Sequence, residues 1–167
     1  AFRIRSMLIK YIHDYFQEHN FIYVNTPIIT GSNCEGAGEM FRVTTHDLDK
    51  LSKDPYDANL NSKDFFGKKV NLTVSGQLEA EAMACSLGKV YTFGPSFRAE
   101  NSNTKKHAAE FWLFEPEMAF TDLGEAMDVV DELLKNIFKR LLCNCSQEID
   151  YFTNFLNKSL YILLASK

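Results

Sequence analysis

Apolar residues recur every three or four positions at both ends of the chain, the spacing that places them on one face of an α-helix. Residues 2–19 carry on this face Ile4, Leu8, Tyr11, Ile12, Tyr15 and Phe16. Residues 123–143 continue the pattern, and Asp122 with Glu125 has the spacing of a capping box at their start. The apolar stripe of this second helix, which we expect in the core, consists of Leu123, Met127, Val130, Leu133, Leu134, Ile137, Phe138 and Leu141. A last amphipathic helix is expected over residues 149–164.

The middle of the chain changes to short runs of β-branched and aromatic residues separated by polar loops, which indicates a sheet. Residues 21–24 predict a strand that is over by Pro27, because proline cannot donate a ladder hydrogen bond. Residues 65–74 predict two short strands around a glycine turn. Two longer runs, 90–97 and 111–120, flank a polar loop and predict an antiparallel strand–loop–strand unit.

Serine and glycine mark the boundaries of the remaining segments. Ser75 is placed as the N-cap of a helix that begins at residue 76 or 77 and ends at residue 87, and Gly88 stands at its C-terminal end. Residues 30–41 hold three glycines and two carboxylates, which suits a hinged loop over a ligand or a flexible surface loop. Residues 46–64 are polar without periodicity and predict an exposed insertion. The predicted fold class is α+β, an antiparallel β-sheet flanked by helices in one domain.

Composition places the chain among globular proteins and limits the kinds of partner that it can bind. It has 167 residues, 46% hydrophobic and 13% aromatic, enough for one packed core. Its net charge of -4 means that contact with nucleic acid depends on local basic patches. The longest apolar run is too short for a bilayer and no signal-peptide pattern is present, so we expect a soluble cytoplasmic protein, with an organellar address as the alternative. The four cysteines form no CxxC pair, so we expect reduced thiols and no metal site.

Charged side chains gather on both sides of the polar loop that joins the two long strands. Arg98 and Glu100 are two positions apart, so both are expected on one face of the first strand. Phe111, Glu115 and Glu117 share one face of the second strand by the same alternation. Burying an unpaired charge is costly, so this surface is solvated, paired across the strands, or part of a site.

The loop between these strands favours a ligand site. Lys105, Lys106 and His107 follow Arg98 in a chain that is acidic elsewhere, and such side chains bind phosphate. The ring of Phe111 offers a planar surface on which a base can stack. Phosphates and a base together indicate a nucleotide. A solvent-exposed face of Arg–Glu pairs stays open as the alternative.

Three stretches resemble one known family. The run FRAENSNTKKHAAEFWLFEPEMAF resembles motif 2 of the class II aminoacyl-tRNA synthetases, in their aspartyl/asparaginyl subgroup. By this resemblance motif 2 covers residues 90–120. The helix, strand and terminal proline of residues 1–30 are similar to motif 1 of that family. The run ITGSNCEGAGEMF is similar to the family's loop that closes over the amino acid.

The resemblance implies that motif 2 binds ATP. Arg98 would be the catalytic residue, its fork holding phosphate and carboxylate oxygens while one anion attacks the other. Glu100 would accept from the adenine amino group or orient the loop, and Phe111 would stack on the base. Lys106 and His107 would reach the outer phosphates. Family members mostly have arginine where this chain has Lys106, so the charge is kept but the bidentate geometry is lost.

The same resemblance assigns the amino acid to a second group of residues. Glu35 would bind the substrate ammonium, and Ser75 with Gln77 would hold the amino acid. Aspartyl enzymes of the family carry a lysine three residues after this glutamine, and residues 79–81 offer none. Glu115, on the pocket face of its strand, would accept the amide N–H donors and repel a carboxylate, which favours asparagine over aspartate.

The implied reaction is activation of asparagine by ATP to an adenylate, with Mg²⁺ on the triphosphate, followed by transfer to tRNA(Asn). The implied assembly is a homodimer through motif 1. Residues 1–167 would be an incomplete catalytic domain, since the family's motif 3 and its anticodon-binding barrel are absent from them. Three alternatives stay open: an aspartyl-tRNA synthetase, a synthetase-like paralogue that makes asparagine from aspartate, and a non-catalytic dimerisation module.

Overall fold

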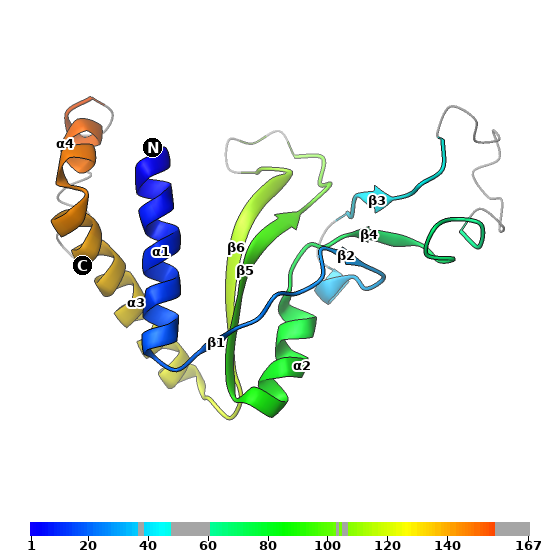
Figure 1. Ribbon diagram of the computed structural model, residues 1–167, viewed down its shortest axis with the longest axis horizontal. Helices are drawn as coiled ribbons and strands as arrows, with labels where there is room; N and C mark the ends of the chain where they lie inside the picture. The colour runs from blue at the N-terminus through cyan, green and yellow to red at the C-terminus, as the bar shows by residue number, and fades with distance from the viewer. Residues whose placement is uncertain (37–38, 48–60, 103, 105–106, 156–167) are drawn as a thin grey trace. The chain divides into compact units, whose positions relative to one another are not determined.

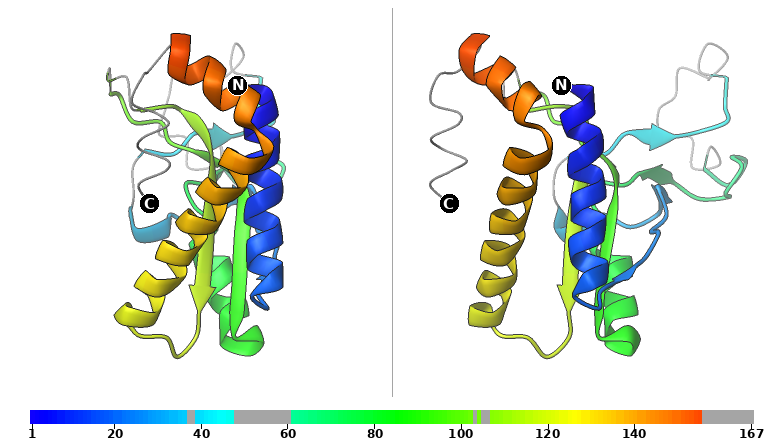
Figure 2. Two further views of the ribbon diagram at one scale, coloured as in Figure 1. Left: turned by 90° about the vertical axis from the view of Figure 1, so that its left-hand side faces the viewer. Right: turned by 60° about the vertical axis from the view of Figure 1, so that its left-hand side comes forward.

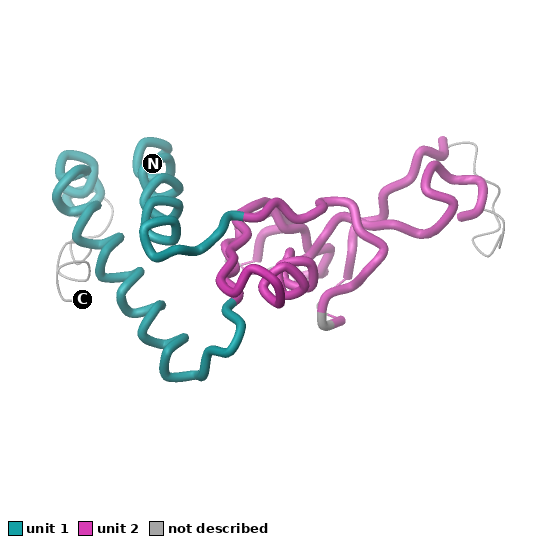
Figure 3. The backbone as a smooth tube through the Cα atoms, turned by 60° about the horizontal axis from the view of Figure 1, so that its bottom comes forward, with its two compact units in different colours: residues 1–23, 118–167 teal, residues 24–117 magenta. Residues whose placement is uncertain are grey.

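The structure is a computed structural model of the chain, whose helices and strands are shown in Figure 1. It describes residues 1–36, 39–47, 61–102, 104 and 107–155. The chain divides into two compact units, Ala1–Tyr23 with Met118–Lys167, and Val24–Glu117 (Figure 3). Among the described residues, no helix is both long and apolar enough to cross a membrane.

The described part of the first unit is mainly helical. It contains α1 (Phe2–Glu18), β1 (Ile22–Tyr23), α3 (Leu123–Asn144) and α4 (Ser146–Phe155). Figure 2 shows α1 alongside α3. The buried side chains of the helices are Tyr11, Ile12, Tyr15, Phe16, Leu133, Ile137, Leu141 and Ile149. The periodicity therefore predicted these helices correctly, and the capping box of Asp122 and Glu125 is present at the start of α3. The last helix begins at Ser146 instead of 149, and its expected part beyond Phe155 lies outside the described residues.

Polar contacts join α1 to α3 within this unit. The Tyr15 hydroxyl donates to the backbone oxygen of Val129 at 3.2 Å, and burial raises the pKa of Tyr15 to about 12. The Asp14 carboxylate accepts hydrogen bonds from Lys10 at 2.7 Å and from Arg140 at 2.5 Å. The bond from Lys10 is the main reason why the pKa of Asp14 lies below its usual value. These bonds place the C-terminal half of α1 beside α3.

The sequence pattern placed Met127 in the core, and this was wrong, because Met127 is 62% exposed. Leu123 and Val130 on the same stripe of α3 are exposed as well. The bond from Tyr15 to Val129 lies near the C-terminal end of α1, so the first turns of α3 run past that end (Figure 1). Periodicity identifies the apolar face of a helix, but not how far the neighbouring helix extends.

The second unit contains two sheets. β5 (Lys89–Phe97) and β6 (Glu110–Met118) pair as neighbours in one sheet and form the predicted strand–loop–strand unit (Figure 1). The other sheet is antiparallel with the order β2–β4–β3, formed by Ile29–Thr30, Val70–Leu72 and Arg42–Val43. Asn71 at its centre is opposite Thr30 on one side and Arg42 on the other.

Helix α2 (Gln77–Leu87) packs against β5 in this unit. The buried cluster between them consists of Val24, Ala80, Ala84 and Val90. Gly88 ends the helix with a φ of 83°, a conformation that favours glycine, as the sequence predicted.

Residues 65–74 contain one strand, β4 (Val70–Leu72), and not the two that the sequence predicted. The Asp64 carboxylate accepts from the backbone N–H groups of Thr45 at 3.0 Å and Phe65 at 2.8 Å. The Gly67 N–H donates to the Asp64 carbonyl at 2.9 Å, and Gly67 has a φ of 62°. An aspartate that binds the following backbone in this way favours a turn over a strand.

Two expected loops are described in part. The glycine-rich segment 30–41 contains a short 3-10 helix, η1 (Cys34–Gly36), while residues 37–38 lie outside the described part of the chain. Of the insertion expected over residues 46–64, residues 48–60 also lie outside it.

Candidate active site

The candidate site begins where the hairpin of β5 and β6 opens. The Arg98 N–H still donates to the Ala109 carbonyl at 3.0 Å, but the Ala99 N–H donates to the carbonyl of Glu39 at 2.7 Å. The ladder therefore ends here, and β5 stops one residue before Arg98. The sequence placed Arg98 and Glu100 on a strand face, and this was wrong, because the bond to Glu39 takes the chain away from β6.

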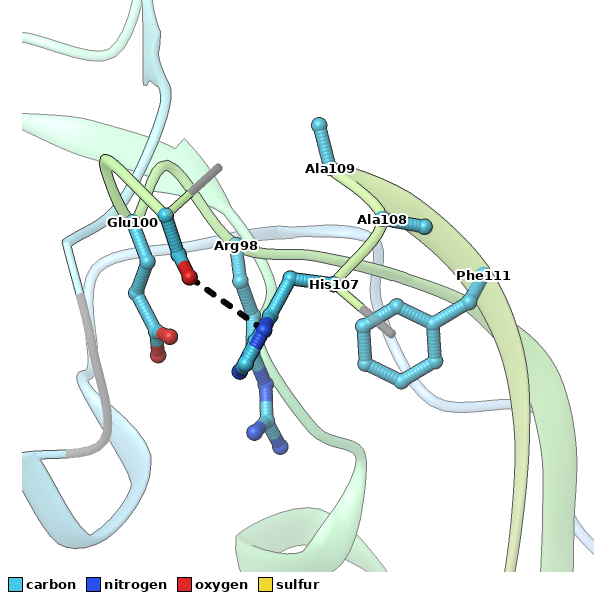
Figure 4. A pocket seen from close by; sticks show the side chains of 7 residues that line it. Arg98, Glu100, His107, Ala108, Ala109 and Phe111 are labelled. Carbon is cyan, nitrogen blue, oxygen red and sulfur yellow. Dashed lines mark hydrogen bonds between the residues drawn. The ribbon is translucent and has the colours of Figure 1, made fainter. Parts of the chain in front are cut away.

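The structure nevertheless brings Arg98, Glu100, His107 and Phe111 together around one pocket. Figure 4 shows the side chains of Arg98 and Glu100 extending in the same direction, with the His107 ring beside Arg98 and the Phe111 ring facing them. The cavity has a volume of about 590 Å³, which is in the range of small-ligand sites. Its lining also includes Ser102, Ala108 and Ala109.

Arg98 provides a positive charge in this pocket and can bind an anion. Its Cζ lies 5.4 Å from the centre of the Phe111 ring, within reach of a cation–π interaction. Its Nε is buried and has no hydrogen-bond partner among the residues that the structure describes. A buried donor without an acceptor costs about 1–3 kcal/mol. A bound oxyanion removes that cost, since the guanidinium fork matches phosphate and carboxylate oxygens.

His107 is held by hydroxyl groups of its own loop. Its Nδ1 is within hydrogen-bond distance of Thr104 Oγ1 and lies 3.2 Å from Ser102 Oγ. These contacts orient the ring and leave Nε2 as the nitrogen that can meet a ligand. Sequence reasoning missed both hydroxyl residues, and their place three and five positions before a histidine in a loop was the available signal. Lys106 lies outside the described residues.

A second group of residues meets at the start of α2. The Ser75 hydroxyl donates to one oxygen of Glu115, and the Gly76 N–H donates to the other at 3.0 Å. The Gln77 N–H donates to Ser75 Oγ at 3.0 Å. The sequence predicted Ser75 as the N-cap, but the N-cap is Gly76, which has no side chain to offer. The Glu115 carboxylate on β6 takes the capping role instead, and its negative charge interacts favourably with the positive end of the α2 helix dipole.

Gly76 is required by close packing, which the sequence did not reveal. A Cβ atom at this position would overlap Thr26 Oγ1 and lie 3.0 Å from Thr92 Cγ2. The absence of a side chain therefore lets the first turn of α2 approach both threonines.

Gln77, which the sequence placed in the amino-acid site, has Glu81 and Cys34 among its side-chain partners. Its Nε2 donates to Glu81 Oε1 at 2.8 Å, and the Cys34 thiol is 3.6 Å from its Oε1. Cys34 lies in η1 and is 4% exposed. Sequence reasoning treated it as an ordinary reduced thiol and missed this contact. Glu35 follows in η1, but its side chain lies outside the described part of the structure.

Backbone bonds hold the two groups of residues on neighbouring segments of one unit. The Phe97 N–H donates to the Thr73 carbonyl at 2.8 Å, and Thr73 Oγ1 donates to the Ser75 carbonyl at 2.6 Å. Arg98 directly follows Phe97, and Ser75 lies two positions after Thr73. A pocket suited to a nucleotide is thus connected to a polar cluster suited to a small ligand with N–H donors.

An antiparallel α+β fold with this pocket at the end of a hairpin is typical of the class II aminoacyl-tRNA synthetases. A family model for tRNA synthetases class II (D, K and N) matches residues 1–163, and the chain belongs to this family. The family resemblance found in the sequence is therefore confirmed.

Similar proteins within the family include asparagine–tRNA ligases. The chain is 57% identical to the asparagine–tRNA ligase of Clostridium kluyveri over 161 residues, which are 96% of this chain and 35% of that protein. It is 56% identical to that of Clostridium tetani over the same share of both chains. It therefore spans about a third of the length of these curated relatives.

Solved structures of synthetases are also similar to this chain. The asparaginyl-tRNA synthetase of Pyrococcus horikoshii in complex with asparaginyl-adenylate superposes with a TM-score of 0.73 at 30% identity, covering 90% of this chain and 30% of that one. A putative aspartyl-tRNA synthetase from Leishmania major has a TM-score of 0.70 at 24% identity, covering 93% and 26%. The second likeness shows the shared fold.

Proposed function

We propose that the protein containing this chain is an asparagine–tRNA ligase, which activates asparagine with ATP and transfers it to tRNA(Asn). The observation that carries the proposal is the buried Nε of Arg98, which has no hydrogen-bond partner among the described residues, in a pocket that also presents the Phe111 ring. An anion and a planar base together satisfy both groups. Identities of 57% and 56% to asparagine–tRNA ligases support the choice of substrate.

In the proposed first step, a carboxylate oxygen of asparagine attacks the α-phosphorus of ATP, and the bond to pyrophosphate breaks. Two anions have to meet, so a fixed cation between them lowers the barrier by charge and by positioning. Arg98 takes this role, and Phe111 stacks on the adenine. Glu100 accepts from the adenine amino group or orients the loop. No general base is needed, because the attacking carboxylate is already ionised.

The outer phosphates of ATP are assigned to His107 and Lys106. His107 is oriented for this by the hydroxyl groups of Ser102 and Thr104. Mg²⁺ enters with ATP as part of the nucleotide substrate and neutralises its triphosphate.

Asparagine is assigned to Glu35, Ser75, Gln77 and Glu115. The Glu115 carboxylate is fixed at α2 by Ser75 and Gly76, and each of its oxygens keeps capacity for a further N–H donor. A substrate amide supplies such donors, whereas a substrate carboxylate meets a like charge and is repelled. This charge argues against an aspartyl enzyme and against a paralogue that starts from aspartate.

Assembly as a homodimer through motif 1, residues 1–30, is part of the proposal. Ile28 and Ile29, next to Pro27, are 44% and 42% exposed, and exposed apolar side chains suit a partner surface. Light scattering of the complete protein at micromolar concentration should give the mass of a dimer, and a fully active monomer would contradict this. The proposed address is the cytoplasm, where this tRNA is used in translation.

The experiment that tests the function is ATP–pyrophosphate exchange by the complete protein. We expect exchange that depends on asparagine, with aspartate at least about a thousandfold less effective, because a polar pocket rejects the wrong charge strongly. Exchange with aspartate alone identifies an aspartyl enzyme. Asparagine formed from aspartate identifies the paralogue. No exchange with either amino acid, in a folded dimer, identifies a non-catalytic module.

A further inference from the structure

Cys34 differs in its surroundings from the other cysteine of its unit. It lies in η1, within the glycine-rich segment 30–41, and is 4% exposed, whereas Cys85 on α2 is exposed. Its Sγ is 3.6 Å from Oε1 of Gln77, which begins α2. This separation suits a hydrogen bond that a thiol donates to an amide oxygen, since sulfur bonds are longer than oxygen bonds. The contact spans 43 positions of sequence and joins the loop to the helix.

This contact decides how the Gln77 amide is oriented. The amide has one acceptor end and one donor end, and the two ends meet different partners. Oε1 faces the Cys34 thiol, a donor, while Nε2 donates to the Glu81 carboxylate at 2.8 Å. Reversing the amide would place the NH₂ group against the S–H and the oxygen against a carboxylate. Cys34 and Glu81 therefore fix the amide in one of its two orientations.

The position of Cys34 also links the glycine-rich segment to the amino-acid residues. The far end of this segment is bonded to motif 2, because the Ala99 N–H donates to the Glu39 carbonyl at 2.7 Å. The near end is bonded to Gln77 through Cys34. The segment is thus attached to both groups of candidate residues, and the Cys34 side chain bonds it to the amino-acid group.

We propose that Cys34 is a positioning residue for asparagine: its thiol holds the Gln77 amide in the orientation that receives the substrate, and it does so only while η1 is seated on α2. The inference deepens the proposed function and rests on it. Cys34 itself does not touch the reacting atoms. The site is therefore sensitive to thiol chemistry although no thiol takes part in the reaction.

Steady-state kinetics of ATP–pyrophosphate exchange with the complete protein test this role. Cys34→Ala removes the donor, and we expect the KM for asparagine to rise about fivefold, the usual effect of one lost hydrogen bond. We expect kcat and the KM for ATP to stay within about twofold, because the Arg98 pocket makes no contact through Cys34. Cys34→Ser restores a donor and should recover part of the loss. Cys85→Ala is the matched control and should behave as wild type.

Thiol labelling provides a readout that does not depend on activity. The Cys34 thiolate adds to the double bond of N-ethylmaleimide, and the ring carbon takes a proton from water. Peptide mass spectrometry should show Cys34 labelled at least about tenfold more slowly than Cys85, because only the exposed thiol is accessible in the folded protein. Gln77→Ala removes the acceptor and should speed labelling of Cys34 without changing that of Cys85.

The outcomes separate this inference from the proposed function. A wild-type KM for asparagine in Cys34→Ala overturns the inference. A variant with a lower unfolding temperature, in which kcat falls and both KM values rise by the same factor, also overturns it. An unchanged labelling rate in Gln77→Ala also overturns it, since the contact is then not made. Wild-type protein without asparagine-dependent exchange overturns the proposed function, and with it the substrate role of Cys34, whereas the labelling comparison still decides the contact to Gln77.

Discussion

Replacing Arg98 with lysine should reduce asparagine-dependent ATP–pyrophosphate exchange by about a hundred- to a thousandfold, the range found when one donor to a developing charge is removed. Lysine keeps the positive charge but has no fork and no Nε donor. The buried Nε, for which the described part of the chain offers no partner, is the atom whose loss should matter most. We expect most of the loss in kcat, because the fork is needed where the carboxylate meets the α-phosphate.

Arg42→Lys is the matched control for this substitution. Arg42 lies on β3 in the same unit, is exposed, and donates to Asn61 Oδ1 at 2.7 Å instead of lining the pocket. We expect its exchange rate to stay within about twofold of wild type, as for an exposed site away from the ligand. An Arg98→Lys variant that keeps more than a tenth of the wild-type kcat contradicts the role given to the guanidinium.

The elements that the sequence predicted well are those fixed by neighbours along the chain. Helices α1 and α3 follow from apolar spacing, and the capping box at Asp122 and Glu125 was visible as two residues three apart. Strands β5 and β6 are long enough for their composition to stand out. Arg98, Glu100, His107 and Phe111 could be grouped because they lie close together in the sequence, in or beside one loop.

The features that the sequence did not predict depend on distant partners. β2 and β3 have two residues each, and only pairing with β4 makes them strands. Arg98 leaves the strand because the next residue bonds to Glu39, some sixty positions earlier. The cap of α2 comes from Glu115, which lies 40 positions after Ser75. These partners lie too far apart in the sequence for any local pattern to include both, and packing brings them together.

Replacing Glu115 with glutamine should lower kcat/KM for asparagine by about a hundredfold while the KM for ATP stays within about threefold. Hydrogen bonds to a charged group are worth about 1.5–3 kcal/mol, which corresponds to a loss of that size. The change removes the negative charge proposed to meet the asparagine amide. It also alters the start of α2, because Ser75 and Gly76 both donate to this carboxylate.

The glutamine side chain can satisfy only part of that arrangement. Its amide oxygen can accept from the Gly76 N–H, but its NH₂ group then faces Ser75 Oγ, and the Ser75 hydroxyl loses the carboxylate oxygen to which it donates. Loss of the anion at the helix start should lower the free energy of unfolding by about 1 kcal/mol, measured by chemical denaturation. That is much less than the expected loss in asparagine activation, so the two effects can be told apart.

Glu110→Gln provides the control on the same strand. Glu110 is the first residue of β6 and is exposed, so we expect its exchange kinetics and unfolding midpoint to match wild type. If Glu115→Gln loses stability but keeps its kcat/KM for asparagine, then the carboxylate caps α2 and does not bind the substrate. If aspartate becomes a better substrate as asparagine becomes a worse one, the negative charge of Glu115 is what distinguishes the two amino acids.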